Sequence, residues 1–283
     1  MQTKLRLPQF RGKPLIIIPN EIPQADFLGG EFGEAVHKQV QGKYGKFQAI
    51  KKIGYIDGVV KGSNSPYVVA VNEVISSEGL RTSTPADLET VLRTNALNLR
   101  GVYEDSALVL RTEGSPNEYL AKNLMKQVKA RNPKQEMPVM IPLSSLELEE
   151  DSDSNYGFAF KLREDAEIIY APILNENNGS FLSEDIDEKT GLPNKLDSNG
   201  NRRLYTRSSG VSRLYLDGGL FLYSDYGGLA DSDVNSRVVV VSAKGASQNF
   251  LSDYLAKLQT ERDKQIAEVQ ERYSKAEAIL KGK

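Results

Sequence analysis

The sequence predicts an α+β fold with a mixed N-terminal part, a β-rich C-terminal half and a long C-terminal helix. Helix start signals alternate with short apolar runs in the first half, whereas Ser, Asp, Asn and Gly separate short β-type runs after residue 150. The 283 residues suffice for one large domain or two ordinary ones. We expect a mixed α+β domain over 1–150, a β-rich domain over 151–246 and a helix over 247–283.

Two apolar runs in the first third predict buried strands. Leu15 to Ile18 lies between two prolines, and Tyr67 to Val71 is rich in β-branched residues. Eight glycines lie between residues 29 and 62. Their spacing favours short strands and loops over long helices in that stretch.

Two helices carry recognisable start signals. The first opens with Ser83 or Thr84 as the N-cap and Pro85 at the first helical position. The second opens with the capping box Ser115 to Glu118, which includes a proline, and should end before Pro133. Apolar residues recur at helical spacing after both signals, so each helix should bury one face.

Short strands account for most of the remaining apolar segments. Ala107 to Leu110 and Val139 to Leu143 fit buried strands, and the alternation over Leu146 to Glu149 fits an edge strand. Residues 158–162 and 167–174 are separated by four residues, which predicts that they pair as a hairpin. A polar loop follows from Asn175 to Asn201, and strands resume through Val241.

An apolar stripe over the last segment predicts a long helix. Apolar residues recur at steps of three and four from Phe250 to Leu280, with an interruption near Arg262. Such a helix could pack back on its own domain or join copies of the chain. We expect it to support a homo-oligomer.

Composition excludes several classes of function. The chain has no Cys, so it has no disulfide framework, thiolate nucleophile or Cys-based metal site. Its net charge of -2 offers no global attraction to nucleic acid or to an anionic membrane. The N-terminal apolar run is too short for a signal peptide or a membrane span. We therefore expect a cytoplasmic protein, or a virion component, without a cofactor.

The chain contains no recognisable catalytic motif. His37 is the only histidine, and a surface or structural role is expected for it. Carboxylates cluster over residues 147–153 and 184–188, but neither cluster has the spacing of a calcium loop. Residues 37–52 interleave lysines with two aromatic residues, the combination that binding of single-stranded nucleic acid requires. One such patch in an acidic protein more often forms a solvated surface. Glu104 and Asp105 resemble metal-dependent nuclease carboxylates only loosely, so no catalytic or metal-ligating residue is assigned.

The stretch from Leu214 to Ser242 has the composition of a binding surface. Its leucines and valines can form an apolar frame, and Asp217-Gly218-Gly219 supplies a hairpin turn. Tyrosines alternate with small polar residues on the other side of that frame. This composition is typical of binding surfaces, because Tyr gives a large contact area at low entropic cost.

Five residue types are missing from residues 196–243. Lys, Glu, Gln, Met and Trp account for 59 of the 283 residues but do not occur in this window of 48. Adenine mutagenesis of AAC or AAT codons cannot produce these five types. In this respect residues 204–242 resemble the variable segment of diversity-generating retroelement target proteins. The resemblance implies a C-type-lectin-like domain, or another β scaffold because Trp is absent, and diversified positions that include Gly218, Gly219, Gly227 and Gly228.

We expect a non-enzymatic protein that binds another protein or a surface ligand through residues 214–237. We do not expect nucleic acid to be a ligand. Two alternatives are a structural subunit of a phage or other self-assembling particle and a metal-dependent nucleic-acid enzyme. The expected ligand-binding residues are Tyr215, Asp217, Phe221, Tyr223, Asp225, Tyr226, Asp231, Asp233 and Asn235.

Overall fold

A computed structural model describes residues 25–175 and 178–242, together with residues 266 and 270. The chain divides into two units, residues 1–242 and 243–283. The predicted strand at residues 15–18 and almost all of the predicted C-terminal helix lie outside the described residues.

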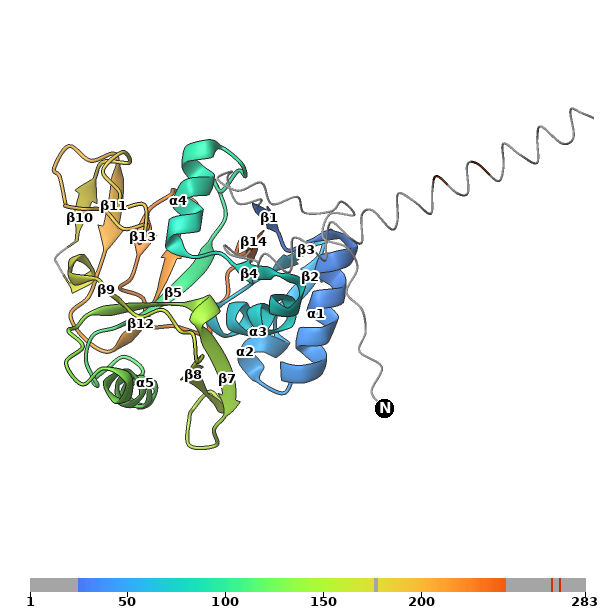
Figure 1. Ribbon diagram of the computed structural model, residues 1–283, viewed down its shortest axis with the longest axis horizontal. Coiled ribbons are helices and arrows are strands. Elements are labelled where there is room, and N and C mark those ends of the chain that lie inside the picture. Colours follow the sequence, from blue (N-terminus) through green and yellow to red (C-terminus); the bar gives the residue numbers. More distant parts are fainter. Residues whose placement is uncertain (1–24, 176–177, 243–265, 267–269, 271–283) are drawn as a thin grey trace, which may run out of the picture. The chain divides into compact units, whose positions relative to one another are not determined.

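Residues 25–242 form a mixed α/β unit (Figure 1). Its described α-helices are α1 (Gly30–Tyr44), α2 (Gln48–Lys51), α3 (Ser65–Ile75), α4 (Pro85–Thr94) and α5 (Glu118–Arg131). Its described strands are β1 (Ala25–Phe27), β2 (Gly54–Ile56), β3 (Val59–Lys61), β4 (Leu80–Thr82), β5 (Glu104–Leu110), β6 (Val139–Pro142), β7 (Leu146–Glu150), β8 (Phe158–Leu162), β9 (Ile169–Tyr170), β10 (Gly179–Phe181), β11 (Arg202–Tyr205), β12 (Val211–Leu216), β13 (Leu222–Tyr223) and β14 (Val239–Ser242).

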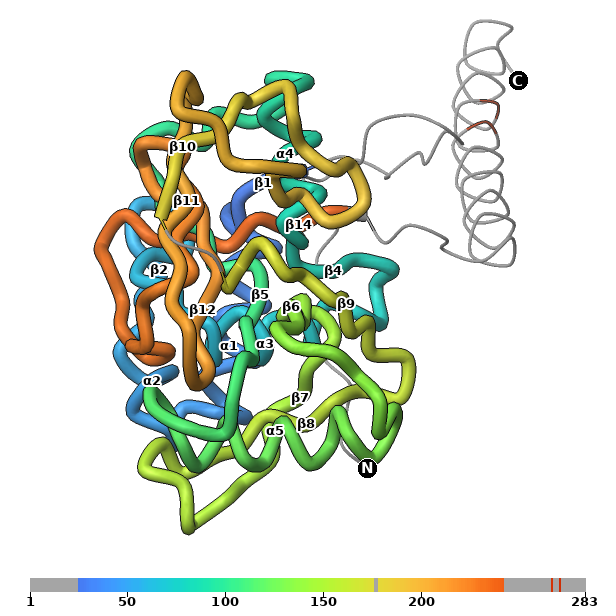
Figure 2. The backbone as a smooth tube through the Cα atoms, turned by 90° about the vertical axis from the view of Figure 1, so that its left-hand side faces the viewer, coloured from blue at the N-terminus to red at the C-terminus, as the bar shows by residue number. Residues whose placement is uncertain are grey.

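A curled seven-stranded sheet is the centre of the unit, in the order β10-β11-β13-β12-β5-β6-β9 (Figure 2). All its neighbouring strands are antiparallel except β11 and β13, which are parallel. A second sheet has the order β1-β14-β4, and β2-β3 and β7-β8 form two hairpins. The predicted domain boundary at residue 150 falls inside the large sheet, since β5 and β6 precede it and the other five strands follow it.

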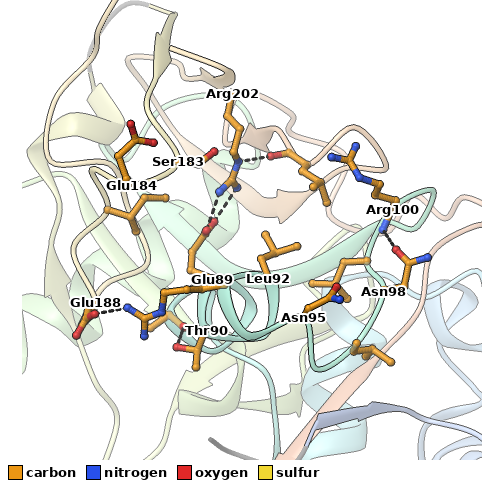
Figure 3. A pocket seen from close by; sticks show the side chains of 16 residues that line it. Glu89, Thr90, Leu92, Asn95, Asn98, Arg100, Ser183, Glu184, Glu188 and Arg202 are labelled. Atoms are coloured by element: carbon orange, nitrogen blue, oxygen red, sulfur yellow. Dashed lines mark hydrogen bonds and ion pairs between the residues drawn. The ribbon is translucent and has the colours of Figure 1, made fainter.

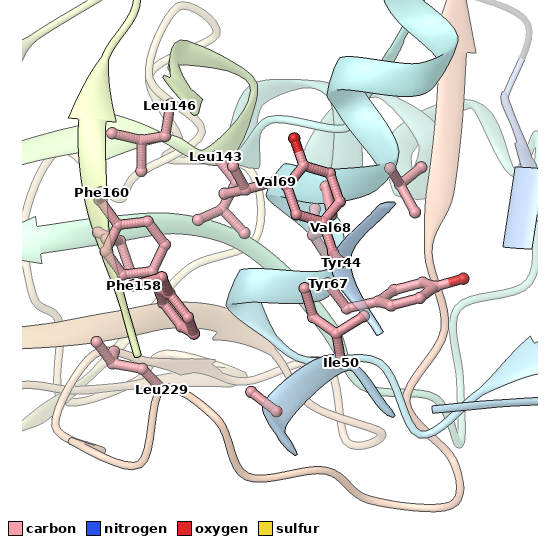
Figure 4. Packing of buried hydrophobic residues seen from close by; sticks show 14 of the residues in the cluster. Tyr44, Ile50, Tyr67, Val68, Val69, Leu143, Leu146, Phe158, Phe160 and Leu229 are labelled. Atoms are coloured by element: carbon pink, nitrogen blue, oxygen red, sulfur yellow. The ribbon is translucent and has the colours of Figure 1, made fainter. Parts of the chain in front are cut away.

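Two apolar clusters cover opposite faces of the large sheet. On one face, Leu108 and Leu110 of β5 join a cluster with α1, α3, α5 and the β7-β8 hairpin (Figure 4). On the other face, Ala107 and Val109 join a cluster that includes side chains of α4 and β14. The alternation of β5 between the two clusters explains why Ala107 to Leu110 are all buried.

Two predictions for the first third of the chain are wrong. Tyr67 to Val71 is part of α3, a helix buried nearly all round and capped by Asn64, whose side chain accepts from the Tyr67 N–H. The glycine-rich stretch contains the 15-residue helix α1. Gly33 suits this helix, because a Cβ there would lie 2.8 Å from the backbone carbon of Leu28.

Two further predictions need correction in detail. The helix expected after Ser115 exists as α5, but Asn117 precedes it in a left-handed conformation and no side chain caps it. The hairpin expected between residues 158–162 and 167–174 does not form. Instead, β8 pairs with β7 and β9 pairs with β6, because sequence spacing alone does not decide between neighbouring partners.

The start of α4 is confirmed in detail. Thr84 and Asp87 form a reciprocal capping box, and Pro85 is the first helical residue. Arg81 of β4 binds both oxygens of the Asp87 carboxylate. Burial raises the pKa of Asp87, but the hydrogen bonds and charge of Arg81 and the bonds from Thr84 outweigh it and hold the pKa below 3.8.

We expect Asp87→Asn to lower the free energy of unfolding at pH 7 by about 2–3 kcal/mol, because it leaves Arg81 without its partner. A lowered folded-state pKa gives stability that is present above pH 3.8 and lost as pH falls through the folded value. The difference between the two proteins should therefore shrink in acid. Urea titrations over a pH series measure it, with the exposed Asp153→Asn as control. A difference that does not change in acid would contradict the role of the carboxylate charge.

Candidate functional site

Three tyrosines from three neighbouring strands form a row on one face of the large sheet. Tyr215 of β12 lies opposite Tyr223 of β13, which lies beside Tyr205 of β11. The ring centroids of Tyr205 and Tyr223 are 4.4 Å apart at 17°, and those of Tyr223 and Tyr215 are 5.2 Å apart at 12°. Tyr103 extends the row at a centroid distance of 6.2 Å from Tyr215. We call these four residues the tyrosine row.

The alternation of side chains along each strand produces this row. The neighbours Leu204, Leu214 and Leu222 all point into the apolar cluster on the opposite face. Their tyrosine neighbours must therefore point the other way. The other apolar cluster takes up Val211 of β12, but it includes no residue of β11 or β13, so the half of the face that carries the tyrosine row is not covered by it.

The tyrosine rings stack on one another and so hide their flat faces. Neighbouring rings are nearly parallel, so each ring covers a face of the next. Burial raises the pKa of Tyr215 to about 12. Burial and the nearby charge of Asp217 raise that of Tyr223 to about 12. Both hydroxyls are therefore neutral near pH 7 and can donate as well as accept.

Two arginines border the tyrosine row. The guanidinium carbon of Arg213 lies 4.4 Å from the ring centroid of Tyr215 and 5.1 Å from that of Tyr226. The corresponding distance from Arg203 to Tyr205 is 5.5 Å. Arg203 is exposed and Arg213 is buried. Planar guanidinium groups over tyrosine rings stabilise both side chains and fix their orientation.

A β-bulge at Ser106 places a carboxylate beneath Arg213. Ala107 lies opposite Leu214 and Asp105 opposite Tyr215, so Ser106 has no residue opposite it. Asp105 thereby lies on the face of Tyr215, with an oxygen 3.5 Å from Arg213. Burial raises the pKa of Asp105 to about 6, although the charge of Arg213 opposes the shift.

The bulge also directs Glu104 toward the second sheet. Its Oε1 accepts from the Val239 N–H at 2.8 Å and from the Ser83 hydroxyl at 3.3 Å. Its Oε2 is buried and has no partner among the described residues. Burial, together with the charge of Asp105, raises the pKa of Glu104 well above its usual range.

The loop after β13 is held firmly beside the tyrosine row. Leu229 is buried in the core cluster near Phe158 (Figure 4). The Asn117 amide donates to the Gly227 carbonyl at 2.7 Å, and the Asn64 amide donates to the Ala230 carbonyl at 2.9 Å. The burial of Leu229 and these two hydrogen bonds hold the loop backbone in place, so its side chains occupy defined positions.

The predicted site residues fall into different environments. Tyr215, Phe221 and Tyr223 lie on or next to the row, and Tyr226 is 45% exposed and donates to Asp231 at 2.6 Å. Asp217 accepts from the N–H groups of Gly219 and Phe221, and Asp233 accepts from that of Asn235, so these carboxylates shape turns. A buried oxygen of Asp225 has no partner among the described residues. Tyr215 is only 9% exposed, in contrast to the outward position expected for it.

Tyr103, Arg203, Tyr205 and Arg213 belong to the site but were not predicted. The alternation of Leu204 with Tyr205 and Arg203 is a strand signal that could have placed both on the exposed face. Tyr103 carries no such signal. It reaches the site because it forms a parallel bridge with Ser236, far away in the sequence.

The other sequence candidates have structural partners. His37 Nδ1 lies 2.8 Å from the Tyr67 hydroxyl, and burial lowers the pKa of His37. Tyr44 and Phe47 in the lysine-rich segment are buried, so they cannot stack on bases. In the described part of the chain, no group of three or more His, Cys, Asp or Glu residues could hold a metal ion, and no helix could cross a membrane.

The chain matches no protein-family model, no curated protein and no solved structure. The resemblance of residues 204–242 to a variable segment therefore depends on their composition alone.

We expect Glu104→Gln to change the free energy of unfolding by less than about 1 kcal/mol near pH 4, where the carboxyl group is largely protonated in both the folded and the unfolded state, because the amide oxygen keeps both accepted hydrogen bonds. Glu104→Ala should cost about 2–4 kcal/mol, since it leaves the Val239 N–H unpaired and opens a cavity. Denaturant titrations measure both changes.

The pH dependence of the same pair distinguishes charge from packing. A raised folded-state pKa contributes stability that is lost as pH rises through that pKa. The Gln variant lacks this loss, so it should become more stable than the natural protein as pH rises above about 4.5. Parallel curves for the two proteins from about pH 4.5 to pH 7, where an unfolded glutamate ionises but the folded one stays protonated, would contradict a raised pKa at Glu104.

Proposed function

We propose that the protein is a non-enzymatic binding protein whose partner is another protein, held at the tyrosine row and the adjoining loop to residue 237. The observation that carries the proposal is the row of stacked rings between Arg203 and Arg213. Tyr and Arg are enriched where protein interfaces bind most strongly, because they combine apolar area with directional hydrogen bonds.

The geometry of the row favours a protein over a nucleic acid. Base stacking needs an exposed ring face, and here neighbouring tyrosines occupy one another's faces. A row of hydroxyl groups bordered by an exposed arginine suits the carbonyl, carboxylate and amide groups of a polypeptide. The fixed loop also supports a protein partner, because a preorganised surface loses little entropy on binding.

We expect removal of three hydroxyls to weaken partner binding on the order of 100-fold, at about 1 kcal/mol for each lost hydrogen bond. The variant is Tyr205→Phe with Tyr223→Phe and Tyr226→Phe, which keeps the ring stack. The control is Tyr119→Phe with Tyr170→Phe, two tyrosines 41% and 46% exposed on other elements.

The measurement is capture of a partner from expressing cells by each immobilised protein, followed by its dissociation constant. Equal capture by the triple variant and the natural protein would contradict the proposal. Size-exclusion chromatography of the same variants tests the alternative of a self-assembling particle subunit. If only the triple variant loses self-association, the partner is a second copy of the chain.

We further propose that variation at this surface, as in a diversity-generating retroelement target, is limited by packing. A Cβ at Gly227 would lie 2.7 Å from the ring of Pro116, and one at Gly218 would lie 3.0 Å from the backbone of Gly101. Tyr226 and Asp233 are exposed, so larger or smaller side chains fit at their positions.

Sequencing of the gene in many isolates tests this limit. Variation should concentrate at codons 223, 225, 226, 231, 233 and 235, opposite adenines in a nearby near-copy of the segment. Codons 218 and 227 should stay glycine. Large side chains at these two positions in folded variants, or the absence of a near-copy, would contradict the proposal.

A further inference from the structure

A pocket of about 650 Å³ lies on the side of the large sheet that α4 covers (Figure 3). Its walls come from α4, from residues 95–100, from residues 183–188 and from the turn after β12. This volume is within the range of roughly 300–1,000 Å³ that is typical of small-molecule sites. None of the residues in the tyrosine row lines it.

One wall of the pocket is a buried ion pair that is already satisfied. Arg202 donates to the two oxygens of Glu89 at 2.6 and 2.7 Å, and its Nε donates to the Leu220 carbonyl at 2.6 Å. This bidentate pair has few donors left for a ligand, so it serves as a rigid, neutral wall. Arg93 and Glu188 likewise pair with each other.

Two charged residues at the pocket have no such pairing. Arg100 and Glu184 both line it, and neither forms an ion pair with another described residue. Figure 3 shows them on opposite sides of the pocket. A ligand that carries an anion at one end and a cation at the other would complement both.

Apolar side chains line part of the space between these charges. Leu92, Leu97, Ile186 and Leu220 line the pocket and pack against the apolar cluster beneath it. We propose that the pocket binds a zwitterion with an apolar body between its charged ends, of the chemical class of short apolar peptides with free termini. The carboxylate lies at Arg100 and the ammonium group at Glu184.

The backbone of Leu220 gives independent support. Its φ of 68° is left-handed, a conformation that costs a non-glycine residue roughly 1–2 kcal/mol. Glycine is preferred at such a hairpin position, and a glycine directly precedes it in Gly219. The strained leucine supplies a pocket wall that a glycine could not supply, and strain of this kind is characteristic of ligand sites.

Calorimetric titration with tri-leucine tests the proposal on the full chain. Tri-leucine with free termini should bind, and its acetylated and amidated form should bind at least 10-fold more weakly. Arg100→Gln and Glu184→Gln should each weaken binding of the free peptide by a similar factor but leave the capped peptide unaffected. Lys189→Gln, outside the pocket lining, is the matched control and should have no effect.

A Leu220→Gly variant tests the contribution of the apolar wall independently of the two charged residues. It should weaken the binding of free and capped tri-leucine alike, because it removes an apolar wall of the pocket but neither charged residue. Absence of binding, equal binding of the free and capped peptides, or binding that survives both charge substitutions would each overturn the proposal.

Discussion

The start of strand β5 fixes the relation between the two sheets and the exposed face. The bulge at Ser106 shifts the alternation of the strand, so that Glu104 and Asp105 emerge toward different partners. Glu104 bonds the backbone of β14 in the second sheet, and Asp105 anchors Arg213 beneath the tyrosines. The binding face and the sheet junction therefore depend on one irregularity.

How much of the fold could be predicted depended on whether the signals were local. The cap and proline of α4 lie within four residues of one another, and that helix was predicted correctly. Tyr67 to Val71 was mistaken for a strand because an apolar β-branched run fits a buried helix equally well. The cap Asn64 and the following Pro66 were the local signals that could have corrected it. The pairing of β7 with β8 had no comparable signal.

The site, like the fold, could be predicted only where its signals lie close together in the sequence. The alternation of leucine and tyrosine placed Tyr215 and Tyr223 on a common face, and the turn at Asp217 followed from its glycines. The parallel pairing that brings Tyr205 beside Tyr223, and the contact of Tyr103 with Tyr215, connect distant segments. The fully buried state of Glu104 was also hidden, because a carboxylate beside another in sequence ordinarily predicts a solvated surface.

The position of β14 has a consequence for the order of folding. Strands β1 and β4 do not pair with each other; each pairs with β14, which lies between them. During synthesis, β1 and β4 therefore cannot form their sheet until β14, which ends at residue 242, has been made. Strand β14 also carries the N–H group that donates to Glu104. Pairings between segments this far apart in the sequence form late, because closing the long loop between them costs conformational entropy before the contacts can form. A ribosome-bound chain cut short before β14 would lack the second sheet altogether.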